Sequence, residues 1–184
     1  MHHIVTAPFD RDAVKAFRAG DTVELSGTIY TARDAAHKKM IDLLAQNKPL
    51  PFDIRKQTIY YVGPCPSREG EVIGSAGPTT SYRMDAYAPA LIELGQTGMI
   101  GKGLRGPEVI AAMMEHGAVY FGAIGGAGAL MAECIKSQEI IAFPELGAEA
   151  LRKLLVEALP LTVLIDCYGS NLYEIGKAQY RKAK

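Results

Sequence analysis

The sequence predicts an α/β protein, a single compact layered domain with a mixed sheet, on the strength of three observations. Stretches typical of strands and of helices alternate along the 184 residues, which is the order found in α/β folds. Several strands in the second half are nearly uninterrupted apolar runs, as expected for parallel strands that are buried on both faces. The chain shows no repeat, low-complexity tract or change of composition, so we predict one domain over residues 1–184.

The individual elements follow from local patterns. Strands are predicted at residues 4–6, 22–30, 58–62, 71–73, 118–123, 139–143 and 161–167. Helices are predicted at residues 11–17, 83–94, 107–115, 148–158 and 170–178, with a short helix that ends near residue 134.

Four local signals refine these elements. Thr31-Ala-Arg-Asp34 fits a capping box and predicts a helix that runs to about Ala45. Gly27 indicates a bulge in its strand, and Pro89 predicts a kink or break in the helix around it. Gly117 is placed to end the helix that precedes it.

Composition excludes several classes of partner. Twenty basic and twenty acidic residues give a net charge of zero, so no field of one sign attracts nucleic acid or a membrane surface. Trp is absent and aromatic residues make up 8%, which argues against a base-stacking platform. No apolar stretch approaches membrane-spanning length and the N-terminus lacks the pattern of a leader. We therefore expect a cytoplasmic, soluble protein.

Cys65, Cys134 and Cys167 are an odd number of cysteines at wide and unequal spacing. Such spacing does not suggest a disulfide framework, and free thiols suit a reducing cytosol. No two of them lie within reach of a CxxC motif, so we expect this chain to contribute no metal ligand.

The segment from Gly74 to Gly103 gathers glycines, hydroxyls and two cations. Glycines allow a backbone to approach a ligand closely, and the hydroxyls of residues 79–81 can cap a helix that begins near Tyr82. Arg83 would add a planar fork suited to a carboxylate beside the start of that helix. The segment therefore indicates an anion-binding loop. The alternative is a tight strand-to-helix turn with a solvated arginine.

Arg33 and His37 lie four residues apart at the start of a predicted helix, so they share a face. A cation is disfavoured at a helix start, and an anionic ligand would offset that cost. This favours a substrate-facing Arg33 with His37 beside it. The alternative is a surface ion pair between Arg33 and Asp34.

The glycines from Gly122 to Gly128 follow a strand, but their spacing is not that of a dinucleotide-binding turn. They are better interpreted as a backbone loop close to a ligand or to another chain. No Ser-His-Asp pattern is found either. What remains is a group of cations and hydroxyls that suits a dicarboxylate or phosphate but lacks an electrophile: Arg33, His37, Thr79, Thr80, Arg83 and Lys102.

Several motifs in this order resemble those of the β subunit of two-subunit class I fumarases and L(+)-tartrate dehydratases, which is also the C-terminal domain of single-chain class I fumarases. The motifs are GDTVELSG at 20–27, RDAAH at 33–37, YVGPCP at 61–66, GPTT at 77–80, RMD at 83–85 and GKG at 101–103, with further likeness at 118–126 and 166–173. Together they span nearly the whole chain.

The resemblance implies a swivelling β/β/α domain. It also implies a partner α subunit, in an α2β2 assembly, that holds an oxygen-sensitive [4Fe–4S] cluster through its own cysteines. The substrate-binding residues of the family carry over onto Arg33, Thr79, Arg83 and Lys102, and Thr79 resembles the residue proposed for proton transfer at carbon. His37 and Thr80 would lie just outside the residues that touch the substrate.

The activity implied is the reversible hydration of fumarate to L-malate, with the cations holding the substrate carboxylates and the partner's iron acting as Lewis acid. A threonine hydroxyl is a poor base, so the neighbouring cations and helix start would have to lower the pKa of Thr79. L(+)-tartrate dehydratase activity stays open, because no residue decides between the two substrates. So does a non-catalytic module that binds a dicarboxylate or another anion.

Overall fold

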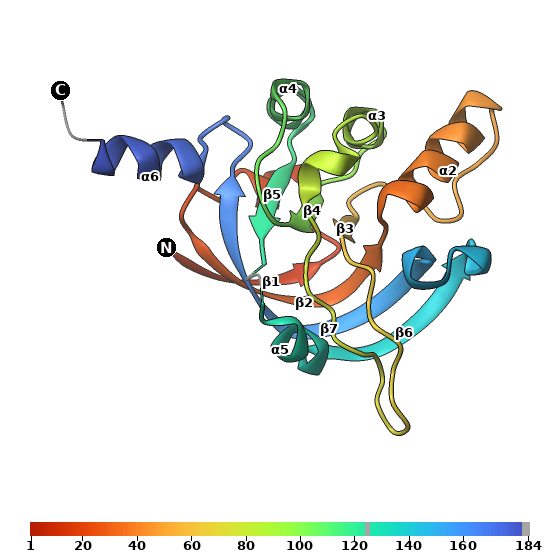
Figure 1. The fold of residues 1–184 in the computed structure, drawn as a ribbon. Helices are drawn as coiled ribbons and strands as arrows, with labels where there is room; N and C mark the ends of the chain where they lie inside the picture. Colours follow the sequence, from red (N-terminus) through yellow and green to blue (C-terminus); the bar gives the residue numbers. More distant parts are fainter. Residues whose placement is uncertain (124–125, 182–184) are drawn as a thin grey trace.

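Strands and helices alternate in the computed structural model, which describes residues 1–123 and 126–181 (Figure 1). The elements are β1 (His2–Ala7), α1 (Arg11–Val14), β2 (Thr22–Thr31), α2 (Asp34–Ala45), β3 (Thr58–Tyr60), the 3₁₀ helix η1 (Ser81–Met84), α3 (Ala88–Glu93), β4 (Gly98–Gly101), α4 (Pro107–His116), β5 (Val119–Gly122), α5 (Gly128–Glu133), β6 (Ile135–Ala142), the 3₁₀ helix η2 (Pro144–Glu149), β7 (Leu151–Ile165) and α6 (Leu172–Tyr180). Part of the predicted loop 122–128 lies outside the described residues. The same holds for residues 182–184 of the basic tail.

The strands form a mixed seven-stranded sheet in the order β1-β2-β3-β4-β5-β7-β6. Strands β1 to β5 run parallel to one another, whereas β7 runs antiparallel to β5 and β6. Strand β7 also pairs with β2 from Thr22↔Thr162 to Thr31↔Arg152, so the sheet folds back on itself. Strands β1, β2, β7 and β6 thereby make one layer, and β3, β4 and β5 make a second. The mixed, partly parallel sheet confirms the predicted fold class.

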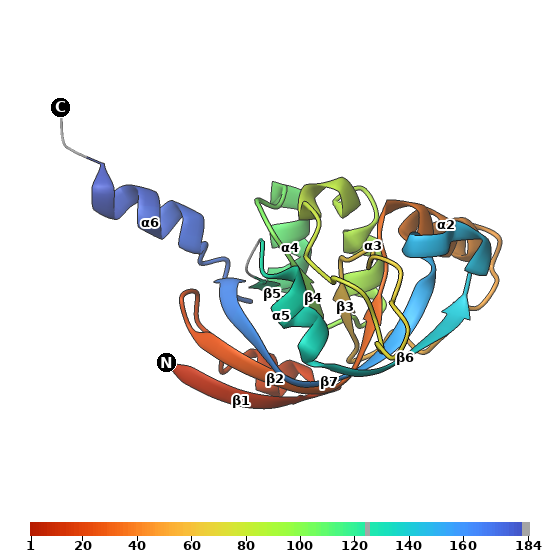
Figure 2. The same cartoon turned by 60° about the horizontal axis from the view of Figure 1, so that its bottom comes forward.

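Three layers result, because α2, α3 and α4 cover the face of β3–β5 that points away from the other strands (Figures 1 and 2). Alternate side chains of a strand point to opposite faces, and this separates two apolar clusters. Tyr60 and Ile100 pack between the two strand layers, with Leu25 of β2. Ile59 and its neighbours pack against the helices, with Met40 of α2. The arrangement has the β/β/α layers that the resemblance implies.

The predicted helix at 148–158 is wrong, because these residues mostly belong to β7. Leucines at 151, 154, 155 and 159 have helical spacing, yet the segment pairs with both β2 and β6. Two residues of β7, Glu157 and Ala158, oppose the single Ser26 of β2 in a bulge. Ala158 has a φ of 49° there, and the bulge shifts the alternation by one residue, which disguises the strand pattern. Pairing on two sides overrides helix propensity.

The predicted capping box at 31–34 is also wrong. Thr31 is the last residue of β2, and its hydroxyl donates to the carbonyl oxygen of Ala150 at 3.4 Å and accepts from the N–H of Arg152 at 3.2 Å. Helix α2 begins at Asp34, with Arg33 as its N-cap, and ends at Ala45 as predicted. The Thr31 hydroxyl therefore bonds to the backbone of the neighbouring segment 150–152, and not to the start of the helix as the local pattern predicted.

Four further predictions need correction or shortening. Residues 71–73 form bends rather than a strand, and α1 ends at Val14 instead of residue 17. The predicted helix at 83–94 is replaced by η1 and α3, and Pro89 lies in the first turn of α3. Thr80 precedes η1 without a side-chain capping bond, so the predicted hydroxyl cap is absent from this described segment. By contrast, α4 ends at a left-handed Gly117 as predicted.

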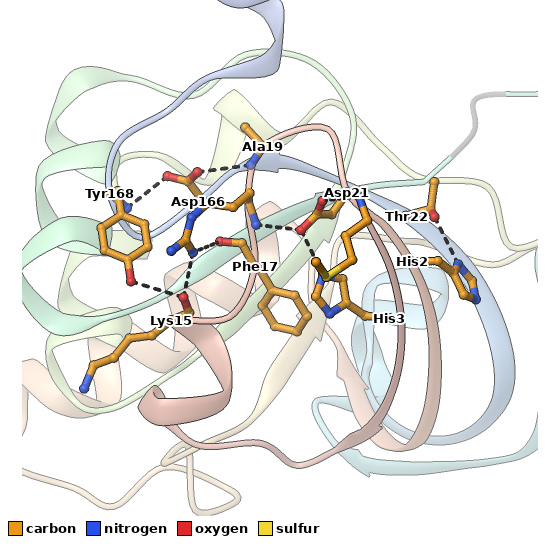
Figure 3. Close-up of polar contacts among 11 residues, drawn as sticks. His2, His3, Lys15, Phe17, Ala19, Asp21, Thr22, Asp166 and Tyr168 are labelled. Atoms are coloured by element: carbon orange, nitrogen blue, oxygen red, sulfur yellow. Dashed lines mark hydrogen bonds and ion pairs between the residues drawn. The ribbon is translucent and has the colours of Figure 1, made fainter.

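Two buried carboxylates connect the N-terminus and the segment after β7 to the turn before β2 (Figure 3). Asp21 accepts from the Met1 ammonium at 2.6 Å and lies 2.8 Å from His3 Nε2. These hydrogen bonds, that of the ammonium first, lower the pKa of Asp21 to about 2. Asp166, which follows β7, accepts from the N–H of Ala19 at 3.0 Å. Within the described residues no helix has the length and apolar character needed to cross a membrane.

Candidate functional site

The predicted site residues gather at the carboxyl ends of neighbouring parallel strands. Arg33 follows β2, Tyr61 follows β3 and Lys102 follows β4. The crevice outside the carboxyl ends of parallel strands is where α/β sheets bind ligands. Thr79 and Arg83 reach the same edge, because their segment returns to β3 and β4 after the loop that follows β3.

We call residues 78–81 and 101–103 the β3–β4 seam, because backbone hydrogen bonds stitch these segments together. The N–H of Thr79 donates to the carbonyl oxygen of Tyr61 at 2.8 Å. The N–H of Lys102 donates to Thr79 at 3.3 Å, and that of Ser81 donates to Lys102 at 2.9 Å. The ladder holds the backbones of Thr79 and Lys102 beside one another, and Thr80 forms a parallel bridge with Lys102.

Gly101 allows this close approach. A Cβ at Gly101 would lie 1.9 Å from Ser81 Oγ, which no real contact permits. The seam exposes Lys102, leaves Thr79 half-buried, and engages neither side chain in a hydrogen bond or ion pair within residues 1–123 and 126–181. It therefore presents an ammonium and a hydroxyl that are available to a ligand.

We call Arg33, Asp34, His37 and Glu149 the α2 corner. Arg33 Nη2 lies 3.2 Å from Glu149 Oε1, and Glu149 Oε2 accepts from the N–H of Ala35 at 3.2 Å. One carboxylate from η2 thus pairs with the cation at the helix start and caps the helix, which offsets the cost of a cation there. The corner is tight on its other side, because a Cβ at Gly63 would lie 2.9 Å from Arg33 Nη1.

His37 lies beneath this corner with no solvent exposure. Its Nδ1 donates to the carbonyl oxygen of Arg33 at 2.9 Å, and its ring meets the Tyr61 ring edge-on with centroids 5.3 Å apart. Burial lowers the pKa of His37 to about 4, so the ring is neutral at pH 7. His37 therefore supports the backbone of Arg33 and does not present a cation to the site.

An ion pair between Arg83 and Asp34 links the α2 corner to η1, which begins at the last residue of the segment 78–81 of the seam. The sequence left open a pair between Arg33 and Asp34 and a solvated Arg83. In the structure Arg33 pairs with Glu149 instead, and Asp34 with Arg83. The Arg83 side chain is 43% exposed. A guanidinium has five N–H donors, so it keeps donors for a ligand.

Sequence reasoning missed Glu149 and Arg105. Glu149 lies inside the segment wrongly predicted as a helix, and nothing in the sequence pairs it with Arg33, 116 residues away. Arg105 is buried and donates from Nε to Asp85 Oδ1 at 2.7 Å. No sequence signal marked Arg105, since an arginine beside a glycine in a loop normally indicates solvent exposure.

The described residues do not form a metal centre. Among the described residues, no three His, Cys, Asp or Glu side chains are placed to hold an ion. All three cysteines are free: Cys65 is exposed, Cys134 half-buried and Cys167 buried. The site offers cations and hydroxyls for an anion.

Comparison with known proteins gives the family. Residues 3–176 match the family model described as Fumarase C-terminus. The chain belongs to this fumarase C-terminal family. It is 41% identical to the aerobic class I fumarate hydratase of Escherichia coli over 154 residues and 39% identical to fumarate hydratase 2 of Leishmania major over 165 residues.

The chain covers very different shares of these relatives. The chain spans only 28% of the E. coli enzyme and 29% of the Leishmania enzyme, although 83% and 89% of the chain is covered. It spans 90% of the putative L(+)-tartrate dehydratase subunit beta of Methanocaldococcus jannaschii, at 40% identity over 176 residues. It thus corresponds to a part of the two fumarate hydratases and to almost all of a protein named as a subunit.

Proposed function

We propose that this chain is the β subunit of a two-subunit iron–sulfur hydro-lyase that hydrates fumarate reversibly to L-malate, a step of the tricarboxylic acid cycle. The observation that carries the proposal is the gathering of Arg33, Arg83, Lys102 and Thr79 at one edge of the sheet in a member of the fumarase C-terminal family. The β-subunit role is supported by the coverage of a relative named as a beta subunit.

In this proposal the three cations bind the two carboxylates of the substrate. Arg83 offers the donors that Asp34 does not use, and Lys102 offers an exposed ammonium at the seam. Arg33, held by Glu149, faces the same edge from the α2 corner. Charges fixed in advance at the places where carboxylate charge increases lower the barrier to removal of a proton from carbon.

Thr79 is the group that we propose for proton transfer at carbon. Its N–H and its carbonyl oxygen are both hydrogen-bonded, to Tyr61 and to Lys102, so the backbone that carries its hydroxyl has a defined position. The neighbouring cations would lower the pKa of that hydroxyl by stabilising the alkoxide. Thr80 and His37 hold this arrangement without touching the substrate: Thr80 through its bridge to Lys102, His37 through the carbonyl oxygen of Arg33.

The electrophile would come from a partner α subunit carrying a [4Fe–4S] cluster, which would serve as a Lewis acid for the substrate. This chain lacks a set of ligands for such a cluster among its described residues, so we assign no ligand here. An α2β2 assembly and a cytoplasmic location are part of the same proposal. The free cysteines suit a reducing compartment.

The second candidate is the β subunit of an L(+)-tartrate dehydratase. It is favoured by the name of the M. jannaschii relative, which the chain spans almost end to end. The two substrates differ by one hydroxyl group. A module that only binds a dicarboxylate is the third possibility, and it predicts binding without turnover in every assembly.

Reconstitution separates these candidates. The chain would be produced with a cluster-bearing α subunit of the same source under anaerobic conditions, and dehydration of L-malate and of L(+)-tartrate would be measured. We expect malate turnover by the complex and none by either chain alone. Turnover of tartrate alone would replace the first candidate by the second, and a stable complex that turns over neither would leave the binding module. Stoichiometric cluster uptake by this chain alone would contradict the assignment of the cluster to the partner.

A further inference from the structure

Arg105 is a buried charge that the proposed chemistry does not use. Its side chain has no solvent exposure. The guanidinium lies between two aromatic rings, 5.3 Å from the centroid of Tyr61 and 5.1 Å from that of Tyr120. Its one ion pair within the described residues is with Asp85, at 2.7 Å, and Nη2 is buried without a partner there. A buried arginine held in this way is costly, which calls for a reason beyond packing.

The partners of Arg105 connect the two segments that carry the exposed cations of the site. Asp85 directly follows η1, two residues after Arg83, and its second oxygen accepts from the N–H of Gly106. Arg105 itself stands three residues after Lys102. The pair therefore ties the turn that carries Arg83 to the loop that carries Lys102.

Tyr120 of β5 makes a second connection between the same two segments, through hydrogen bonds of its hydroxyl. Its hydroxyl lies 3.0 Å from the carbonyl oxygen of Gly103, to which it donates, and 2.9 Å from Ser81 Oγ, from which it accepts. Ser81 begins η1, and Gly103 follows Lys102. Arg105 and Tyr120 also contact one another as cation and ring, so the two ties form one unit.

We propose that Arg105 is a positioning residue: with Asp85 and Tyr120 it locks η1 to the loop 101–106 and so fixes Arg83 relative to Lys102. The inference rests on the proposed function, because it assumes that these two cations bind one dicarboxylate. Arg105 donates from Nε to Asp85 while its planar group lies against two rings, and a lysine cannot reproduce both contacts.

The first test uses the chain alone and needs no activity. Hydrogen–deuterium exchange would be measured for wild type, Arg105→Met and Arg105→Lys. We expect the amides of Ser81, Lys102 and Gly106 to exchange at least about tenfold faster in Arg105→Met, with Arg105→Lys between the two, while amides paired between β2 and β7 keep their rates. Tyr120→Phe, which removes one hydroxyl, should give a smaller change at the same amides.

Arg55→Met is the matched control. Arg55 also pairs with an aspartate, Asp53 at 2.7 Å, but both side chains are exposed and the pair lies away from the site. It should leave the exchange of the seam unchanged. Faster exchange throughout the chain in Arg105→Met and in Tyr120→Phe alike, or no change in either, would overturn the proposal.

The second test uses the assembled enzyme and a double-mutant cycle. A misplacement of about 1 Å costs roughly 10²-fold in rate, so we expect kcat/KM to fall about 10²-fold in Arg105→Met. Combined with Arg83→Lys, the loss should be clearly smaller than the product of the two single losses, because Arg105 acts through Arg83. Combined with Arg33→Lys, the losses should multiply.

If the role of Arg105 were merely structural, the losses in kcat/KM would multiply in both double variants. That result would overturn the proposal. If the wild-type complex turns over no dicarboxylate, the proposed function fails, yet the exchange test on the chain alone still decides whether Arg105 holds the two segments together.

Discussion

The α2 corner and the β3–β4 seam supply cations to one edge of the sheet in different ways. At the corner, Arg33 is 21% exposed and held by a carboxylate from η2, far away in the sequence. At the seam, Lys102 is exposed and the geometry is set by backbone hydrogen bonds and by the absence of a side chain at Gly101. Only the corner therefore depends on charge pairing to orient its cation. The seam depends on close backbone contact, so the two parts should fail under different substitutions.

The largest expected effect is at the seam. Thr79→Ala in the assembled enzyme should lower kcat by about 10²–10⁴-fold, the usual contribution of a positioned acid or base. Binding of a dicarboxylate inhibitor should survive, since the three cations remain. Thr79→Ser serves as the control, because it keeps a hydroxyl. Near-normal kcat in Thr79→Ala would remove Thr79 from proton transfer.

The close contact of the seam can be broken without removing a polar group. Gly101→Ala should lower the free energy of unfolding by about 1–3 kcal/mol, as overpacking does, because its Cβ would meet Ser81 Oγ. Gly176→Ala is the control: nothing lies within 4 Å of a Cβ there. Thermal unfolding compares them. Equal stability of the two variants would show that the seam can accommodate a methyl group at position 101.

The corner should respond to loss of charge. Glu149→Gln keeps the shape of the side chain but weakens its hold on Arg33, so we expect KM for the dicarboxylate to rise several-fold and stability to fall by about 1 kcal/mol. Glu145→Gln in the same 3₁₀ helix breaks only an exposed pair with Lys39 and should change neither. Steady-state kinetics and chemical denaturation measure both. If the two variants behaved alike, Glu149 would not position Arg33.

The last expected effect appears only when the pH is lowered below neutrality. The unfolded chain protonates His37 near its ordinary pKa of 6.5, whereas the native chain does so only near 4. The unfolded state therefore binds more protons between these values, and the free energy of unfolding should fall as pH drops from about 6.5 to 4. His37→Asn, whose amide can still donate to Arg33, should flatten this slope. An unchanged slope in His37→Asn would contradict the buried, neutral ring.

The same contrast explains what could be predicted from the sequence. The seam consists of short stretches of consecutive residues, in which glycines, hydroxyls and cations stand together as GPTT and GKG. The sequence alone therefore pointed to these residues. Glu149 could not be found, because only the pairing of β7 with β2 and β6 brings η2 to the start of α2. That pairing was itself hidden, since the leucines of β7 have helical spacing and the bulge at Ala158 interrupts the alternation of buried residues. Arg105 was missed because its burial arises from Tyr61, which follows β3, and from Tyr120 of β5, and these lie far apart in the sequence.

The central claim is that the α2 corner, the β3–β4 seam and Arg83, which follows the seam, bind one substrate together. Lysine substitutions at Arg33 and at Arg83 test it most directly. Arg33→Lys and Arg83→Lys keep the charge but lose the planar fork, and one charge-assisted hydrogen bond contributes about 1.5–3 kcal/mol. In the assembled enzyme we predict that each variant lowers kcat/KM for L-malate by more than about tenfold. Values within about twofold of wild type for both variants would show that neither arginine touches the substrate and would contradict the account.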